Sequence, residues 1–500
     1  MLATRCVFTC LGNPNGVGLF ARTRLQEMGN SQSTDDMLRQ SNIKLLNFGV
    51  DWFKQTKAIK HVVKKNIKYV PENIFLNSRG VDDSKDQANK GKTHNQLYTI
   101  HYSHEDTKTI SEKSPIVMLH GHSQSAANYY AVLPVLTNAV DRHVFALDML
   151  GCGLSTREKW KHGFGEDCDL KVAESYFVDA IEEWREKMGI EKICLVGHSM
   201  GGYVSFCYAE KYPERIENLT LISPVGVPPP GNRDYSNAPF HIRFLFGAIR
   251  GAWSRGYSNF NVVNTIGRGY TTDMYCNGRY RPGMSWYNKK LVADQMYYNI
   301  INGNVSGGGY SHTTLLQVGA YARNPLVYRF PSAFEKIKSV SFIYGETDWM
   351  DIRSAENYRD QLLQDNSQME EAEKISIYKV MGAGHTLTID NPIATANAIG
   401  RSVNQTDYGV TSTMELGLVP LMLDCGISDE ISPGLSIEGQ WGRWKNNEWR
   451  PGQLVDIDEM RGVCKVKWDD SGKVTKRFPL YRVRVPDELS TKQPTNLGNL

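Results

Sequence analysis

The chain has 500 residues, of which 22% are charged, and its formal net charge at neutral pH is +3. This length predicts more than one domain, because single cores stop growing at about 250 to 300 residues, and the near balance of charge does not indicate a nucleic-acid partner. The nine cysteines follow no paired spacing and no apolar run approaches the ~20 residues that span a bilayer, so we expect reduced thiols, no metal or cofactor site, and at most peripheral membrane contact.

The N-terminal region divides into a leader, residues 1–36, and a basic segment, residues 37–95. The leader carries arginines and no acidic residue before position 27, which is typical of a mitochondrial presequence, but its glycines and proline also fit a disordered tail. Residues 37–70 have helical spacing and many lysines, and a polar loop follows. Trp52 and Phe53 on such a helix predict either docking to anionic lipid headgroups or packing of the helix on its own domain.

Residues 96–227 alternate between apolar strands, glycine-containing loops and helices. This alternation predicts a mostly parallel, doubly wound sheet with helices on both faces. The expected strands are 96–102, 116–119, 144–148, 193–196 and 219–224, and the expected helices are 129–137 and 172–188.

Ser199 lies in the sequence Gly197-His198-Ser199-Met200-Gly201, between an apolar strand and a predicted helix. Glycines two residues before and after the serine are typical of a sharp strand-to-helix turn, because a Cβ there would collide with the neighbouring elements. Such a turn exposes the serine hydroxyl at the C-terminal edge of a sheet. Ser199 is therefore the candidate nucleophile.

The strand 116–119 ends at His120-Gly121. A glycine after a buried strand lets the next amide turn toward a reacting carbonyl, which predicts an oxyanion hole formed by the backbone amides of His122 and Met200. We interpret His120 as a histidine that braces this loop rather than as a catalytic residue.

Residues 228–335 interrupt the pattern and are far longer than the ~2 to 6 residues of an ordinary connection, so they predict a functional cap. Its aromatic residues either line an acyl-chain pocket or hold the cap on the core. They include Phe240, Phe244, Phe246, Trp253, Tyr270, Tyr275, Trp286, Tyr297 and Tyr298.

The sheet resumes in the second half of the core, residues 336–403, with predicted strands 340–345 and 375–380. Asp348 follows the first of them and His385 follows the second. A carboxylate in this place can hold the tautomer of a catalytic histidine, and Asp351 is the rival for that role. The chain order Ser199, Asp348, His385 is the order that this kind of fold requires.

The C-terminal region is predicted to contain a linker, residues 404–432, and a small β-barrel of SH3-like or Tudor-like type, residues 433–488. Short strands separated by turns support the barrel. Its tryptophans either form a recognition groove for a partner or make up the core of the barrel. They are Trp441, Trp444, Trp449 and Trp468.

Between about Tyr98 and Ser402 the chain resembles the lipid-droplet-associated branch of the α/β-hydrolase superfamily. That branch contains the coactivator of adipose triglyceride lipase and its plant and yeast lysophosphatidate acyltransferase relatives. The resemblance rests on His120-Gly121, Asp148 to Ser155, Gly197 to Val204, Tyr344 to Asp351, His385 to Pro392, and two pieces of the cap, Asp294 to Tyr298 and Tyr321 to Leu326.

The resemblance implies an α/β-hydrolase fold in which Ser199, Asp348 and His385 form a catalytic triad. It also implies that His385 and Asp390 form the H-x-x-x-x-D acyltransferase signature of the branch, although Asp390 is equally placed to be a helix N-cap ahead of Pro392. The coactivator has lost its serine, whereas Ser199 is present here. The resemblance therefore favours an enzyme over a purely regulatory protein.

These features predict a serine hydrolase or acyltransferase of glycerolipid or lysophospholipid esters, with acyl-CoA as a candidate co-substrate. The expected location is cytoplasmic, at the surface of lipid droplets or membranes, with mitochondria as the alternative. The competing hypothesis is a non-catalytic pseudo-hydrolase scaffold that regulates a lipase at lipid surfaces, with the C-terminal barrel as a site for a protein partner.

Overall fold

The computed structural model describes the core of the chain and separate parts of its two ends. The predicted leader up to residue 32, the polar loop 77–94 and most of the predicted cap lie outside the described residues. The described residues are 33–55, 67–76, 95–104, 113–229 without 141 and 159, 251–255, 287–303, 313–317, 321–416, 434, 436–441, 448–458, 463–479 and 483–484.

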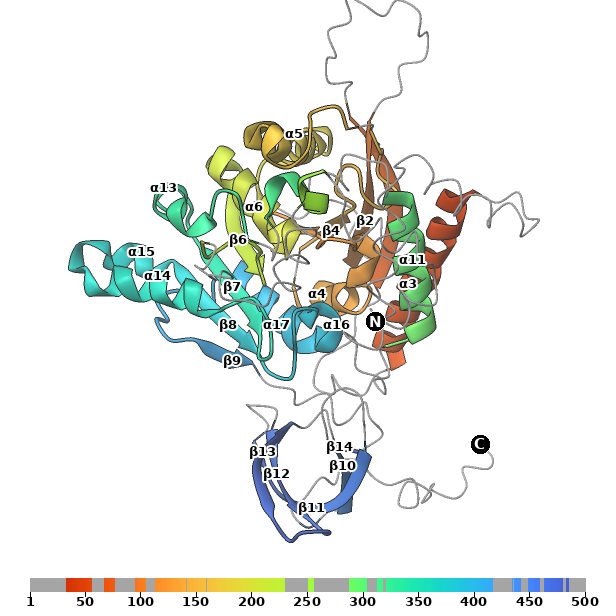
Figure 1. The fold of residues 1–500 in the computed structure, drawn as a ribbon, viewed down its shortest axis with the longest axis vertical. Coiled ribbons are helices and arrows are strands. Elements are labelled where there is room, and N and C mark those ends of the chain that lie inside the picture. The colour runs from red at the N-terminus through yellow and green to blue at the C-terminus, as the bar shows by residue number, and fades with distance from the viewer. Residues whose placement is uncertain are drawn as a thin grey trace, which may run out of the picture.

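The core is built on a nine-stranded sheet with the order β1-β2-β4-β3-β5-β6-β7-β8-β9 (Figure 1). All neighbours from β4 to β9 are parallel, whereas β1 and β2 form an antiparallel edge. The predicted mostly parallel sheet is therefore confirmed. Its strands are β1 Ile67–Phe75, β2 Gln96–His104, β3 Ile116–Leu119, β4 Val144–Leu147, β5 Ile193–His198, β6 Ile216–Ile222, β7 Val340–Gly345, β8 Ile375–Val380 and β9 Met414–Leu416.

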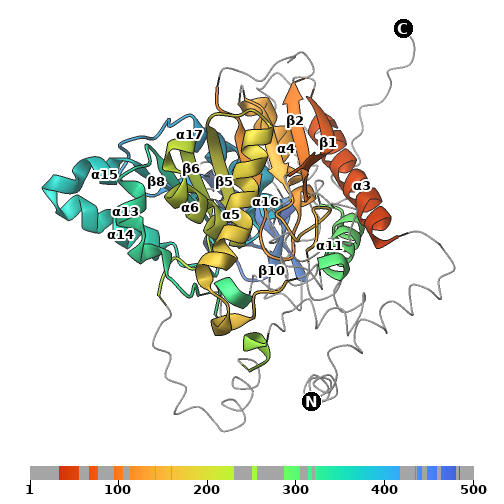
Figure 2. The same cartoon turned by 90° about the horizontal axis from the view of Figure 1, so that it is seen from above.

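Helices cover both faces of the sheet, because the central strands are buried on both sides and need apolar cover. One layer packs α5, α6, α13, α14 and α15 into a single core cluster; the other packs α3, α4, α11, α16 and α17 (Figure 2). The helices are α3 Thr34–Gln55, α4 Val132–Ala139, α5 Leu170–Lys187, α6 Met200–Lys211, α11 Lys289–Gly303, α13 Phe330–Phe334, α14 Arg353–Gln364, α15 Met369–Glu373, α16 Leu387–Asp390 and α17 Pro392–Val403.

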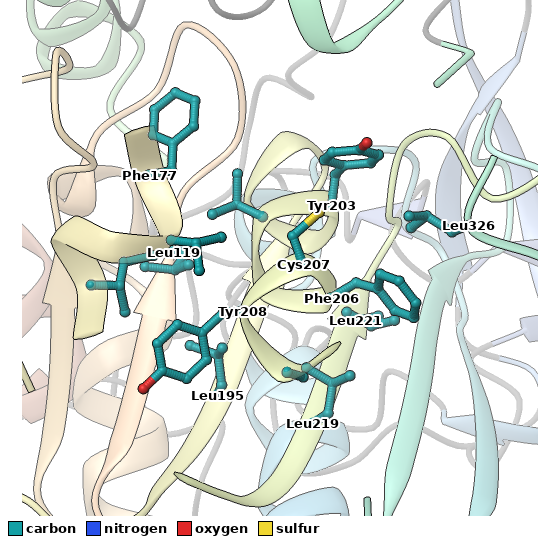
Figure 3. Packing of buried hydrophobic residues seen from close by; sticks show 14 of the residues in the cluster. Leu119, Phe177, Leu195, Tyr203, Phe206, Cys207, Tyr208, Leu219, Leu221 and Leu326 are labelled. Atoms are coloured by element: carbon teal, nitrogen blue, oxygen red, sulfur yellow. The ribbon is translucent and has the colours of Figure 1, made fainter. Parts of the chain in front are cut away.

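Helix α6 is buried almost all round, which fixes the position of the turn that precedes it. Figure 3 shows Phe206 of this helix close to Leu221 of β6, and Tyr208 close to Leu195 of β5. All four side chains are buried in one cluster. The N-terminus of α6 is therefore held at the C-terminal edge of the sheet.

The basic segment differs from its prediction in two ways. Its helix, α3, ends at Gln55, and residues 67–75 form the edge strand β1 rather than a continued helix. Pairing with β2 along the whole strand overrides the helical spacing, and Pro71 is tolerated because the strand lies at an edge. Trp52 and Phe53 are only 6% and 1% exposed and belong to the core, so docking by insertion of Trp52 into a lipid surface is excluded.

The C-terminal region also departs from the predicted boundaries. Within the predicted linker, β9 continues the main sheet by pairing in parallel with β8. Further on, five antiparallel strands form a second sheet with the order β13-β12-β11-β10-β14. Trp468 is buried in it and its indole donates to Thr475 Oγ1 at 2.8 Å, while Trp444 lies outside the described residues. The strands are β10 Ser436–Trp441, β11 Glu448–Asp458, β12 Val463–Trp468, β13 Val474–Pro479 and β14 Val483–Arg484.

Among the helices in the described part of the chain, none combines the length and apolarity that a membrane span requires. The described residues likewise contain no cluster of three or more histidine, cysteine or acidic side chains arranged to hold a metal ion.

Candidate active site

Ser199 lies at the turn between β5 and α6 with φ 55° and ψ −115°, a conformation that L-residues rarely adopt. Its flanking glycines make the turn possible. A Cβ on Gly197 would lie 2.2 Å from the carbonyl oxygen of Gly201, and one on Gly201 would lie 2.3 Å from the carbonyl oxygen of Leu119. Both contacts are with rigid backbone, so only glycine fits at either position.

A chain of hydrogen bonds joins Ser199, His385 and Asp348, which come from three separate strand ends. His385 Nε2 lies 3.0 Å from Ser199 Oγ, and His385 Nδ1 lies 3.0 Å from Asp348 Oδ1. The carboxylate of Asp348 is 1% exposed, whereas the imidazole of His385 is 13% exposed. A buried acceptor at Nδ1 selects the tautomer that leaves Nε2 free to accept the serine proton.

Two further donors hold Asp348 in its ionised form. The hydroxyl of Ser223 donates to Oδ2, and the backbone N–H of Met350 donates to Oδ1 at 3.0 Å. Burial raises the pKa of Asp348, but these hydrogen bonds and the neighbouring His385 outweigh it, so the pKa lies below its ordinary value. Ser223 was not identified from the sequence. The available signal was its place directly after β6, at the edge of the sheet where Ser199 and Asp348 also lie.

The rival carboxylate, Asp351, lies elsewhere. It is exposed and forms a bidentate ion pair with Arg353 at 2.8 Å, on the first turn of α14. The hydrogen bond of Arg353 is the main cause of its lowered pKa. The structure thus brings Asp348 to His385 and directs Asp351 toward solvent.

The loop after β3 lies directly against Ser199. A Cβ on Gly121 would be 3.1 Å from Ser199 Cβ, and the Gly121 N–H is held by Gln124 Oε1 at 3.2 Å. This places His122 in the turn beside Ser199 and Met200 at the first position of α6. The oxyanion hole formed by their two amides stays a prediction.

His120 sits behind this loop and binds backbone at both ring nitrogens. Nδ1 donates to the carbonyl oxygen of Gly121 at 2.8 Å, and Nε2 accepts from the N–H of Met149 at 3.1 Å. Burial lowers its pKa to about 4, so the ring is neutral near pH 7. These contacts fit the bracing role that the sequence indicated.

Asp390 was expected to be either a catalytic partner of His385 or a helix N-cap. The N-cap of α17 is instead Asn391, whose side chain accepts from the N–H of Ala394. Asp390 is buried at the end of α16, and its Oδ2 accepts from the N–H of Gly384 at 2.8 Å. The N-cap interpretation is therefore wrong. Asp390 braces the backbone immediately before His385.

Trp349 was not singled out in the sequence. Its ring centroid lies 4.9 Å from that of His385, and the residue is 57% exposed. An exposed indole thus lies beside the imidazole of His385. Its position directly after Asp348 was the only sequence signal.

Comparison with known proteins agrees with this architecture. A family model described as alpha/beta hydrolase fold matches residues 114–372, more than half of the chain. A 1-acylglycerol-3-phosphate O-acyltransferase from Arabidopsis thaliana is 26% identical over 342 residues, covering 66% of this chain and 75% of that protein.

Two animal proteins are also similar. The human 1-acylglycerol-3-phosphate O-acyltransferase ABHD5 is 28% identical over 305 residues, covering 60% of this chain and 78% of that protein. The abhydrolase domain-containing protein abhd-5.2 of Caenorhabditis elegans is 31% identical over 245 residues, covering 49% of this chain and 51% of that protein. The chain thus spans about half the length of this last relative.

Proposed function

The chain belongs to the α/β-hydrolase family, and on this premise we propose that it is a serine hydrolase or acyltransferase of glycerolipid or lysophospholipid esters. The observation that carries the proposal is the continuous hydrogen-bonded path from Ser199 Oγ through His385 to Asp348. The names of the relatives, 1-acylglycerol-3-phosphate O-acyltransferases, support a lipid acyl substrate.

In the proposed reaction, Ser199 Oγ attacks the ester carbonyl while His385 Nε2 takes the hydroxyl proton. The carbonyl oxygen becomes negative, and the amides of His122 and Met200 donate hydrogen bonds to it. Asp348 stays ionised and stabilises the imidazolium. When the ester C–O bond breaks, His385 returns the proton to the leaving alcohol, and the acyl group remains on Ser199.

The fate of the acyl-enzyme separates hydrolysis from transfer. Water attacking the acyl-enzyme, with His385 as base, gives a fatty acid. A lysophospholipid hydroxyl in place of water gives a new ester, with either a lipid ester or acyl-CoA as the donor. The chemistry requires no metal or cofactor, because all proton movements use His385 and the developing charge is met by backbone amides.

Incubation of the purified chain with lysophosphatidate and acyl-CoA, followed by mass spectrometry of the lipids, tests this proposal. We expect new phosphatidate or free fatty acid from the wild type, and neither from Ser199→Ala. Equal product from both proteins would contradict the role of Ser199. No product from either, on these lipids and on a soluble short-chain ester, would favour the regulatory scaffold instead.

We also propose that the protein works peripherally at the cytoplasmic surface of lipid droplets or membranes, with Trp349 as a contact. Indole rings favour the boundary between water and lipid, and this one borders His385. Trp349→Ala should weaken flotation with phosphatidylcholine liposomes. Tyr328→Ala removes another exposed aromatic, 68% exposed, as the matched control. Equal flotation of Trp349→Ala and wild type would contradict the contact.

For the C-terminal sheet we propose an SH3-like barrel that binds a protein partner and takes no part in the chemistry. Short antiparallel strands and the buried Trp468 support this. Deletion of residues 433–500 should leave turnover of a soluble ester close to that of wild type, because no residue of the triad or of the predicted oxyanion hole lies there. A loss as large as that of Ser199→Ala would contradict this assignment.

A further inference from the structure

Two buried amide side chains reach from the insertion between β6 and β7 into the loop after β3. Both belong to α11. Gln295 Nε2 donates to Ser125 Oγ at 2.7 Å, and Asn299 Nδ2 donates to the carbonyl oxygens of Ser123 and Gln124 at 3.0 and 2.9 Å. The two amides are four residues apart and therefore lie on one face of the helix. Because only a nitrogen can donate to two carbonyl oxygens, the orientation of the Asn299 amide is fixed.

The loop that they hold is strained. Ser123 has φ 62°, in the left-handed region that a residue with a Cβ rarely occupies. Such conformations persist only where the surroundings enforce them. Asn299 binds the carbonyl oxygens of Ser123 itself and of the next residue, so it fixes both peptide groups that follow the strained position.

The loop after β3 also contacts the residues on both sides of Ser199. The backbone carbonyl oxygen of Gln124 is held by Asn299. The side-chain Oε1 of Gln124 accepts from the Gly121 N–H and lies 3.1 Å from His198 Nδ1. Gly121 lies against Ser199, and His198 precedes Ser199 in the chain. A contiguous set of contacts therefore runs from α11 through Gln124 to both sides of Ser199.

The adjacent face of α11 is packed against the N-terminal helix. Figures 1 and 2 show α3 and α11 side by side. Val292, Met296 and Ile300 of α11 share one buried cluster with Leu45 and Phe53 of α3. Packing against α3, including the buried Phe53, thus helps to hold α11 in place.

We propose that Gln295 and Asn299 are positioning residues that set the amide-bearing loop Gly121–Ser125 against Ser199, so that turnover depends on seating of α11. The proposal rests on Ser199 being the attacking residue. A misplaced loop weakens stabilisation of the developing oxyanion and leaves ground-state binding of a small ester nearly unchanged. The effect therefore falls on kcat and not on KM.

The test is the steady-state kinetics of the full chain on a soluble short-chain ester. Asn299→Ala should lower kcat by about 10²-fold, of the order seen when one oxyanion donor is lost, with KM within roughly two-fold of wild type. Asn299→Asp keeps the volume but presents no N–H to the two carbonyl oxygens, so it should lose at least as much. Gln295→Met, which removes one hydrogen bond at similar volume, should show the same kcat-selective loss to a smaller extent.

Lys290→Ala, a change at an exposed position of the same helix, is the matched control. It should leave both kcat and KM at their wild-type values. Should Asn299→Ala fail to fold, Gln295→Met decides. Wild-type kcat in folded Asn299 and Gln295 variants, or a loss confined to KM, would overturn the proposal. Ser199→Ala in the same assay separates the two claims. If Ser199→Ala is inactive, wild-type kcat in the Asn299 and Gln295 variants overturns only the positioning role of these two residues. If Ser199→Ala is active, the proposed function fails as well.

Discussion

The side chain of His198 donates from Nε2 to the backbone carbonyl oxygen of His385 at 2.8 Å. This bond ties the turn that carries Ser199 to the loop that carries His385. Burial, reinforced by the neighbouring His385, lowers the pKa of His198 to about 3. The ring is therefore neutral wherever the protein is folded near neutral pH, and the tie between the two loops does not titrate there.

The lowered pKa of His198 predicts a loss of stability in mild acid. The unfolded chain takes up a proton near pH 6.5 and the folded chain does so only near pH 3, so the free energy of unfolding falls as pH decreases through this window. One such group contributes a slope of up to about 1.4 kcal/mol per pH unit. In urea unfolding between pH 7 and 4, His198→Asn should show a shallower dependence than wild type. Parallel curves for the two proteins would contradict the buried neutral state.

His385→Ala should abolish turnover on any ester. Among the described residues, His385 is the base whose nitrogen lies within hydrogen-bond distance of Ser199 Oγ. The expected loss in kcat is at least about 10³-fold, as for removal of other triad members. Steady-state kinetics on a soluble ester measure it, and a variant that keeps wild-type kcat would rule out His385 as the base.

Asp348→Asn and Asp351→Asn form a matched pair at neighbouring positions. The first change should lower kcat by roughly 10³- to 10⁴-fold, because the amide can hold the wrong histidine tautomer. The second breaks an exposed ion pair with Arg353 and should alter kcat by no more than about two-fold. If the larger loss followed Asp351→Asn, the assignment of the carboxylate would be reversed.

The positions of the core strands along the chain, their mostly parallel arrangement, and the meeting of Ser199 with His385 were predictable because local signals and chain order agree there. The end of α3 and the strand β1 were not, since the deciding interaction is pairing with β2, and a helical spacing of apolar residues contains no information about it. Pro71 was the one local sign. The partners of Asp390 were equally hidden, because the N–H of Gly384 becomes available only after the turn is folded.

Because Trp52 is buried against the core, Trp52→Ala should lower the free energy of unfolding by about 3 to 5 kcal/mol. Lys44→Ala, an exposed change on the same helix, should stay within about 0.5 kcal/mol of wild type. Chemical denaturation monitored by circular dichroism gives both values. An unchanged stability of Trp52→Ala, together with weaker liposome binding, would restore the docking role that the structure excludes.

The most direct test of the central claim is covalent labelling with a fluorophosphonate, followed by mass spectrometry of the proteolysed chain. The probe requires a serine whose hydroxyl is activated by a base, and Ser199 Oγ bonded to His385 Nε2 meets this requirement. We predict one adduct, on the peptide that contains Ser199, in the wild type, no adduct in Ser199→Ala, and strongly slowed labelling in His385→Ala. Adduct formation on a different serine, or no labelling of the folded wild type, would contradict the account.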